Sequence, residues 1–327
     1  MQRIRSRSAQ LTLAASFLIA STAALAQESY PVKPVKLVVS SSPGGGTDTT
    51  ARLIAPKVSE LLGKQLVIEN RPGAASMIGS EYVARSAPDG YTLLIVPSTI
   101  TIVPSTYRKV AFDTMRDFAP ITQIVVVPQM LVGHPSLPAK NVKELVALAK
   151  AQPGKLDFAG GSYGANPHMA MVLFLNMTGT QMTYVPYKSG NAGLADALAG
   201  HVHLMMGNIL AVLPHVKSGR FRPFGVTSGK RAVGAPDIPT IAESGLTGYE
   251  SLQWFGVMAP AGTPREIVTR LHRDIVKVVN ENEIRQKFLN DGAEPHPSAS
   301  PEAFQSFMRD EIGKWAKVVK QAKLKPQ

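Results

Sequence analysis

The chain contains no cysteine among its 327 residues. This absence excludes disulfide bonds, a cysteine nucleophile, thiolate metal ligands and a lipid-modified N-terminal cysteine. Acidic residues are also scarce, because 23 Asp and Glu face 35 Lys and Arg and leave a formal net charge of +12. The basic residues are spread singly along amphipathic segments, so the charge favours solvated helix faces over a nucleic-acid surface. We therefore expect no nucleic-acid partner.

Long apolar runs are absent as well, except at the N-terminus. Residues 1–26 carry three arginines and no acid, then an apolar stretch, then Ala24-Leu25-Ala26. This order is typical of a cleaved secretory signal peptide. A membrane anchor is the alternative, but the apolar stretch is shorter than the roughly 20 residues that a spanning helix needs. We expect export and a soluble protein in the periplasm.

The remaining chain alternates short apolar runs with helical periods. Strand, helix, strand, helix and strand are expected between residues 36 and 96, and the pattern restarts after residue 140. Such alternation predicts parallel strands with helices on both faces. We therefore predict an α/β fold with two lobes, each a sheet flanked by helices, and hinge crossings near Val125–Pro128 and Tyr249–Trp254. The first lobe would hold residues 27–126 and 253–327, and the second lobe residues 127–252.

A glycine-rich turn follows the first predicted strand, in the sequence SSPGGGTD. A helix that begins near Thr47 and Asp48 would direct several backbone N–H groups and its dipole at an anion. The simpler interpretation is a tight strand-to-helix turn with Thr47 or Asp48 as the helix cap. A nucleotide loop is excluded because neither Gly-Lys-Ser/Thr nor Gly-x-Gly-x-x-Gly is present.

A counterpart lies in the second predicted lobe, where Gly160-Gly-Ser162-Tyr-Gly164 leads into another helix. Asn166 would cap this helix, and Pro167 suits its first turn. Two such turns at the carboxyl ends of two sheets predict an anion-binding cleft.

Two alternatives use other chemistry. Gly160 to Gly164 matches the Gly-x-Ser-x-Gly elbow of serine hydrolases, with Asp291 and His296 following in the required order. Pro167 argues against it, because an elbow helix starts directly after the serine and would place this proline in its interior. His201 and His203 form a His-x-His pair on a predicted strand, but no third ligand is evident. We therefore predict neither a metal nor a cofactor, and no enzymatic activity.

The ordered motifs PGGGTD, ENRPGA, APDGYTLL, VPYK, PTIAESG and WFGVMAPAGTP cover essentially the whole predicted mature chain. Together they make it resemble the tripartite tricarboxylate transporter receptors, also called Bug-type periplasmic solute-binding proteins. The resemblance implies a periplasmic-binding-protein fold of type II, in which two lobes close on a small carboxylate. It also implies that backbone amides, hydroxyl groups and ordered water hold the ligand.

The resemblance also places the predicted ligand contacts. They are Gly44, Gly45, Gly46, Thr47 and Asp48 in the first turn and Ser162, Tyr163, Gly164 and His168 in the second. Position at a strand edge alone adds Ser98, Thr99 and Asn208 to the predicted contacts. Among these, Asp48 is expected to act as a cap, because a carboxylate repels an anion. The chain departs from the usual family pattern at Ser40–Ser42 and at Ala165–Pro167, both within the expected pocket.

The predicted function is a monomeric receptor that captures a small carboxylate and delivers it to a membrane permease. Aliphatic di- or tricarboxylates, aromatic carboxylates and amino acids remain open as ligands. A serine hydrolase that uses Ser162 and a receptor that signals to a membrane sensor remain as alternative functions.

Overall fold

The computed structural model describes residues 30–187 and 190–327. The predicted signal peptide at 1–26 lies outside the described residues. Residues Lys33–Gln327 form one compact unit, to which the following description applies. In the described part of the chain, no helix combines the length and the apolar character that membrane spanning requires.

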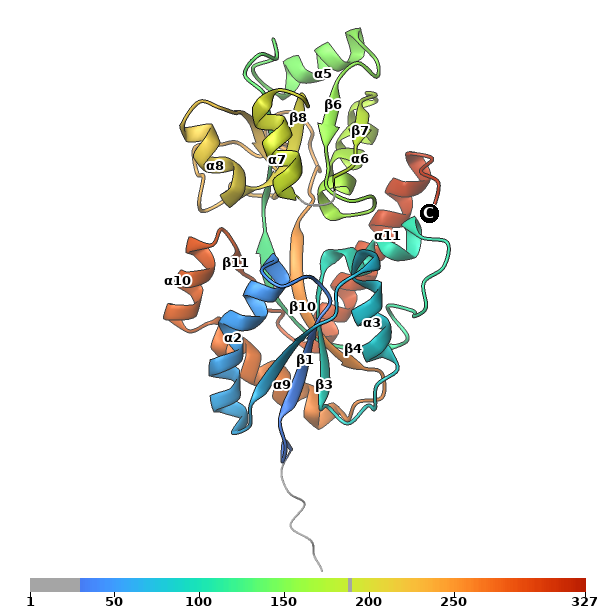
Figure 1. The fold of residues 1–327 in the computed structure, drawn as a ribbon, viewed down its shortest axis with the longest axis vertical. Coiled ribbons are helices and arrows are strands. Elements are labelled where there is room, and N and C mark those ends of the chain that lie inside the picture. Colours follow the sequence, from blue (N-terminus) through green and yellow to red (C-terminus); the bar gives the residue numbers. More distant parts are fainter. Residues whose placement is uncertain (1–29, 188–189) are drawn as a thin grey trace, which may run out of the picture. The chain divides into compact units, whose positions relative to one another are not determined.

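The first sheet has the strand order β11-β4-β10-β3-β1-β2 (Figure 1). Its strands β1, β2 and β3 run parallel, whereas β10 pairs antiparallel with both β3 and β4. The strands of this sheet are β1 (Val35–Val39), β2 (Leu66–Asn70), β3 (Thr92–Pro97), β4 (Phe118–Val127), β10 (Gln253–Pro260) and β11 (Glu294–Pro295).

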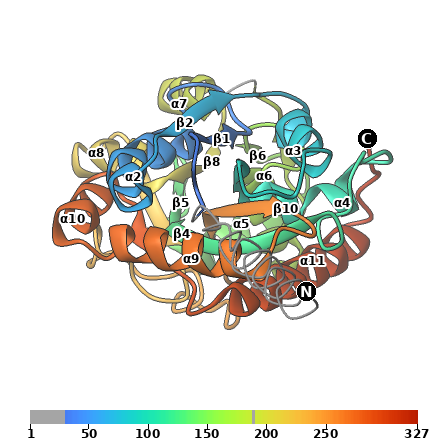
Figure 2. The ribbon, with the colours of Figure 1, turned by 90° about the horizontal axis from the view of Figure 1, so that it is seen from below.

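Helices cover both faces of the first sheet. On one face α2 lies beside α9 (Figures 1 and 2). On the other face, α3 and α11 pack through Val83 and Phe304 against apolar strand residues and the buried Trp254. The helical segments around this sheet are α2 (Gly46–Leu62), η1 (Ala74–Ser76), α3 (Met77–Ala84), η2 (Ser98–Thr101), α4 (Val103–Thr106), α9 (Arg265–Val279), α10 (Asn282–Asn290) and α11 (Pro301–Gln321).

The second sheet has the strand order β7-β6-β8-β5-β9. Strands β6, β7 and β8 are parallel, and β5 pairs antiparallel with β8 and β9. Helices α5 and α6 cover one face, and α7 and α8 cover the other. The elements are β5 (Gln129–Gly133), α5 (Val142–Ala151), β6 (Asp157–Ala159), α6 (Asn166–Thr178), β7 (Thr183–Val185), α7 (Gly190–Ala199), β8 (Leu204–Asn208), α8 (Ile209–Lys217) and β9 (Arg222–Val226).

The chain passes from the first sheet to the second at Pro128, between β4 and β5, and returns just before β10. Proline suits this position because it has no N–H to leave unpaired where the chain changes sheets. Both crossings lie in the predicted ranges. The two-lobed α/β architecture is thus confirmed. Each sheet is mixed, because β10 and β11 in the first sheet and β5 in the second run opposite to the other strands of their sheet.

Helix α11 contacts elements of both sheets. Trp315, Val318 and Val319 of α11 pack with Ile102 beside the first sheet and with Met169 and Val172 of α6 in the second. The amide nitrogen Nδ2 of Asn176 donates a hydrogen bond of 3.0 Å to the carbonyl oxygen of Val318. The C-terminal helix is therefore a third connection between the sheets, besides the two crossings.

Candidate functional site

A cavity of about 500 Å³ lies between the carboxyl ends of the parallel strands of the two sheets. Residues from both sheets and from both crossings line it. They are Ser41, Gly45, Gly46, Thr47, Pro97, Thr99, Gln129, Gly161, Ser162, Ala165, Asn166, Pro167, Gly190, Met205, Met206, Gly207, Asn208 and Gln253. None of these described lining residues is Lys, Arg, Asp or Glu, so the described part of the cavity wall carries no full charge.

The first wall is the N-terminus of α2. Its N-cap is Gly45, so the expectation that Thr47 or Asp48 occupies the cap position is wrong. Gly44 has a φ of +77°, which glycine adopts without strain. A Cβ on Gly46 would lie 2.9 Å from the ring of Phe255, so only glycine fits there. The backbone N–H groups of Gly46, Thr47 and Asp48 have no acceptor among the described residues.

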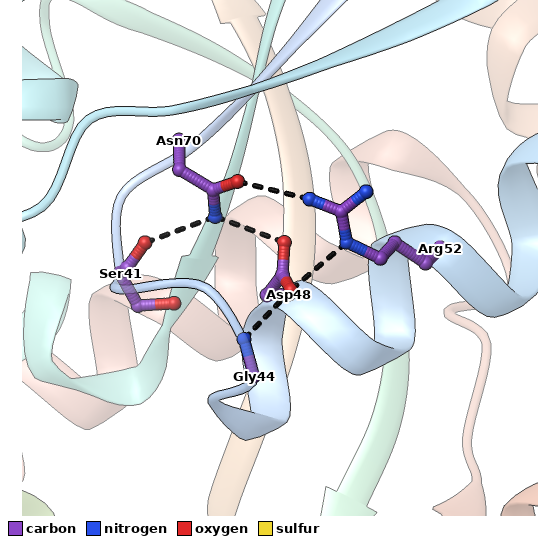
Figure 3. Close-up of polar contacts among 5 residues, drawn as sticks. All are labelled: Ser41, Gly44, Asp48, Arg52 and Asn70. Carbon is purple, nitrogen blue, oxygen red and sulfur yellow. Dashed lines mark hydrogen bonds and ion pairs between the residues drawn. The ribbon is translucent and has the colours of Figure 1, made fainter.

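The Asp48 carboxylate holds this turn from behind (Figure 3). It accepts hydrogen bonds from the Gly44 N–H, from Nε of Arg52 and from Nδ2 of Asn70, each at 2.9 Å. Asn70 also donates to the carbonyl oxygen of Ser41, at 3.2 Å. One buried carboxylate therefore fixes both ends of the loop between β1 and α2.

Burial alone would raise the pKa of Asp48, but the hydrogen bonds from Arg52, Gly44 and Asn70 outweigh it and lower the pKa below its ordinary value of 3.8. The carboxylate is thus ionised at neutral pH, and all three donors are directed at it. Asp48 does not line the cavity. Its side chain stabilises the turn from outside the cavity and so acts as a brace. The N–H groups at the start of α2 are left free for another anion.

The second wall is the turn between β6 and α6. Ala165 is the N-cap of α6, so the prediction that Asn166 caps this helix is wrong. Asn166 is instead the first helical residue, and its Nδ2 donates to the carbonyl oxygen of Leu252 at 3.1 Å. Pro167 occupies the first turn, as predicted. The N–H groups of Asn166 and His168 have no acceptor in the described part of the chain.

His168 lies behind this wall and is 2% exposed. Its ring centroid is 4.2 Å from that of Tyr184 and 5.0 Å from that of Tyr163. Nδ1 accepts a hydrogen bond from the Gly164 N–H at 3.2 Å, so the proton of the neutral ring is on Nε2. Burial lowers the pKa of His168 to about 4, so the imidazole is neutral at pH 7.

Tyr163 and Gly164 also support the turn and do not line the cavity. The Tyr163 hydroxyl donates to the carbonyl oxygen of Lys325 in the C-terminal segment, at 2.8 Å. Gly164 has a φ of +71°, and a Cβ there would lie 2.9 Å from the Oγ1 of Thr106 beside the first sheet. Contacts from outside the second sheet therefore help to position its ligand turn.

The predicted ligand contacts divide into two groups. Those that line the cavity are Gly45, Gly46, Thr47, Thr99, Ser162 and Asn208. Those that do not are Gly44, Asp48, Ser98, Tyr163, Gly164 and His168. Gly44, Gly46 and Asn208 also line an adjoining chamber of about 250 Å³. Ser98 is fully buried just after β3, and its hydroxyl has no partner among the described residues.

Sequence reasoning missed Gln129 and Gln253, which line the cavity where the two crossings meet. Their side chains approach each other, with 3.4 Å between Nε2 of Gln129 and Oε1 of Gln253. The signal was present, because each glutamine interrupts an apolar run next to a predicted crossing. Ser41 and Asn166 were noticed only as a departure from the family pattern and as a cap, yet both line the cavity.

The geometry of the described residues supports neither the serine-hydrolase interpretation nor the metal-site interpretation. Helix α6 begins at Asn166, four residues after Ser162, whereas an elbow helix starts at once after the serine. Among the described residues, no hydrogen bond joins Ser162 to His296, whose N–H donates to the carbonyl oxygen of Ile124.

His201 and His203 precede β8, so the expectation that this His-x-His pair lies on a strand is wrong. His203 Nδ1 lies 2.6 Å from Asp157 and His201 Nδ1 lies 3.6 Å from Asp196. In the described residues, no group of three or more His, Cys, Asp or Glu could hold a metal ion.

Comparison with known proteins gives consistent matches. Residues 50–324 match the tripartite tricarboxylate transporter family receptor. Protein BugT of Bordetella pertussis is 35% identical over 93% of this chain and 94% of its own length. The structure of R. palustris Rpa4515 with adipate is 39% identical, has a TM-score of 0.80 and covers 91% of this chain and all of its own.

The structure of the periplasmic binding protein BugD is 32% identical, has a TM-score of 0.77 and covers 91% of this chain and all of its own. Both the sequence matches and the structural matches extend over nearly the full length. The chain therefore belongs to the tripartite tricarboxylate transporter receptor family.

Proposed function

We propose that this protein is a periplasmic receptor that captures a small carboxylate between its two sheets and delivers it to a membrane transporter. One observation carries the proposal. The N-termini of α2 and α6, on different sheets, open onto one cavity and leave five backbone N–H groups without a protein acceptor among the described residues, at Gly46, Thr47, Asp48, Asn166 and His168.

These groups suit an anion for electrostatic reasons. A helix N-terminus carries roughly half a positive charge, and its free N–H groups donate to carboxylate oxygens. The described lining residues include no Lys or Arg, so among these residues helix dipoles and hydrogen bonds would balance the ligand charge. The hydroxyl groups of Thr47 and Ser162 would add further donors.

The two-sheet arrangement supports capture by closure. The cavity has one wall from each sheet, and the two crossings and α11 connect the sheets. We infer a first lobe of residues 27–126 and 253–327 and a second lobe of residues 127–252. A ligand that contacts both walls favours the closed form by its differential affinity for that form. The adipate in the structure of Rpa4515 and the family's role as transporter receptors support a carboxylate ligand and a transporter partner.

The test is the substitution Gly45→Asp at the N-cap of α2. Gly45 has a φ of −74°, which a non-glycine residue adopts readily. The new carboxylate would accept hydrogen bonds from the free N–H groups of Thr47 and Asp48, which is the usual role of an N-cap aspartate. It would occupy the site of the ligand's own carboxylate, so the helix gains stability while the protein loses its ligand.

Binding is measured by calorimetry and by thermal unfolding against adipate, succinate, benzoate and the amides of these acids. A ligand at about 100 times its dissociation constant adds roughly 2.7 kcal/mol to the unfolding free energy. We expect stabilisation by a carboxylate and none by its amide, with affinity reduced at least about 100-fold in Gly45→Asp. Gly45→Ala is the matched control, since it adds the same Cβ without the charge. Equal affinities in the two variants would contradict the proposal.

A further inference from the structure

Three residues that line the cavity each carry a buried side-chain polar atom that has no hydrogen-bond partner among the described residues. These atoms are Oγ of Ser41, Oε1 of Gln129 and Oδ1 of Asn166. Buried polar groups in folded proteins are nearly always paired, and leaving one unpaired costs free energy. A ligand or a bound water that enters the cavity would therefore be expected to pair with them.

The free atom of Asn166 is identified as an acceptor by its neighbour. Nδ2 donates to the carbonyl oxygen of Leu252, which can only accept, so the amide nitrogen must face Leu252. The oxygen Oδ1 is consequently the atom left without a donor. The whole residue is 2% exposed, so bulk water does not supply one.

Gln129 presents a second acceptor of the same kind. Its backbone N–H donates to Oγ1 of Thr227, its backbone carbonyl accepts from the Thr227 N–H, and its Nε2 faces Gln253. Only Oε1 remains unpaired, on a residue that is 1% exposed. The cavity thus combines donors at the two helix N-termini with acceptors at two amide oxygens.

A carboxylate alone does not match this arrangement, because it only accepts hydrogen bonds and leaves both amide oxygens without donors. A ligand that also carries a donor would satisfy both sets of groups. An ammonium group is disfavoured because no described lining residue is Asp or Glu to balance its charge. A hydroxyl group adds a donor without charge, and its oxygen can accept from the Ser41 hydroxyl.

We infer that the site selects a hydroxycarboxylate, with Asn166 and Gln129 as the specificity-determining residues whose amide oxygens share the hydrogen bond that the ligand's hydroxyl group donates. This inference rests on the proposed function, since it assumes that the helix N-termini hold a carboxylate. It assigns these two side chains a role distinct from that of the glycine turns, because they distinguish among carboxylates and the turns bind all of them.

The test compares matched ligands that differ only in the 2-substituent: succinate, malate and aspartate, then glutarate, 2-hydroxyglutarate and glutamate, then adipate and 2-hydroxyadipate. Dissociation constants are measured for the wild-type protein and for Gln129→Met and Asn166→Leu, which keep the side-chain size and remove the acceptor. Asn166→Leu also loses the hydrogen bond to the carbonyl oxygen of Leu252. If Asn166→Leu folds poorly, Gln129→Met still tests the inference.

Gln123→Met is the matched control. Gln123 is also a buried glutamine, on β4, with an unpaired amide nitrogen, but it does not line the cavity. We expect the wild type and Gln123→Met to bind the hydroxy ligand of a pair about tenfold more tightly than its unsubstituted partner, as one or two hydrogen bonds supply. In Gln129→Met and Asn166→Leu this ratio should approach one.

A purely structural role would weaken both ligands of a pair equally and leave their ratio unchanged. Equal binding of both ligands by the wild type would overturn the inference and leave bound water as the partner of the amide oxygens. Tighter binding of the amino analogue would overturn it as well. If none of these carboxylates binds, the proposed function itself fails and the inference fails with it.

Discussion

The two ligand turns present the same groups to the cavity but are held in place by different chemistry. The turn before α2 is braced by an ionised carboxylate, Asp48, with donors from Arg52, Asn70 and Gly44. The turn before α6 is braced by the neutral ring of His168, which packs against the tilted rings of Tyr163 and Tyr184. Each bracing side chain makes one hydrogen bond to a turn glycine, at Gly44 and Gly164 respectively.

This difference shows that two different kinds of side chain can hold the same turn geometry. An ionised side chain can stabilise such a turn when its charge is saturated by donors and kept outside the cavity. A neutral aromatic cluster achieves the same result without charge. The two braces should respond differently to acid, since burial lowers the pKa of His168 to about 4 and hydrogen bonds lower the pKa of Asp48 below its ordinary value of 3.8.

The largest expected effect is the loss of unfolding free energy on acidification that His168, beside the turn before α6, causes. Between pH 6.5 and 4 the unfolded chain binds a proton at His168 that the folded protein excludes, so acidification favours unfolding. The ring is neutral in both states at pH 7, and acidification to about pH 4 lowers the free energy of unfolding by about 3 kcal/mol. Tyr163 and Tyr184 face the ring, and burial raises the pKa of both above 10, so they stay neutral throughout.

The measurement is the free energy of unfolding in urea at several pH values between 7 and 4. His168→Phe keeps an aromatic ring in the stack and cannot be protonated, so we expect a much flatter pH dependence. This variant should be less stable at pH 7 by about 1 kcal/mol, because the Gly164 N–H loses its acceptor. An unchanged pH slope in His168→Phe would assign the acid response to other groups.

A smaller effect is expected at the α2 turn. Asp48→Ala leaves the Gly44 N–H without its acceptor and removes the charge that orders Arg52 and Asn70, so we expect a loss of about 2 kcal/mol. Ligand affinity should fall too, because the loop that presents the helix N-terminus is no longer fixed. Arg52→Ala is the control: this side chain is 54% exposed, and its loss should cost less than about 1 kcal/mol. Similar losses in the two variants would show that Asp48 is not the centre of the brace.

The smallest expected effect distinguishes two tyrosine hydroxyl groups that support the turn before α6. The Tyr163 hydroxyl bonds to Lys325, whereas the Tyr184 hydroxyl donates at 2.6 Å to the carbonyl oxygen of Gly161, which lines the cavity. Removal of either hydroxyl by Tyr→Phe should cost about 1 kcal/mol of stability. Calorimetry should show weaker ligand binding for Tyr184→Phe and nearly unchanged binding for Tyr163→Phe. The opposite order would mean that the C-terminal segment controls the site.

Much of the fold could be predicted because its signals are local. The parallel strands β1, β2 and β3 and their helices follow from short apolar runs, helical periods and stops such as Gly63, which has a φ of +69°. The strands β4, β5 and β10 were not predicted as strands. Their apolar runs carry no clear period, and their antiparallel partners lie far away in the sequence, as β4 and β10 show.

The candidate site, like the fold, has features that the sequence predicts and features that only the tertiary structure decides. The sequence by itself determined the two glycine turns, because a strand, small residues and a helix start within a few positions of one another. Tertiary structure alone decided which residues line the cavity and which stand behind it. Asp48 and His168 are turned away from the cavity by partners such as Asn70 and Tyr184, and Gln129 reaches it only because the two crossings meet there. Such contacts depend on how the two sheets pack, and no short segment of sequence encodes that packing.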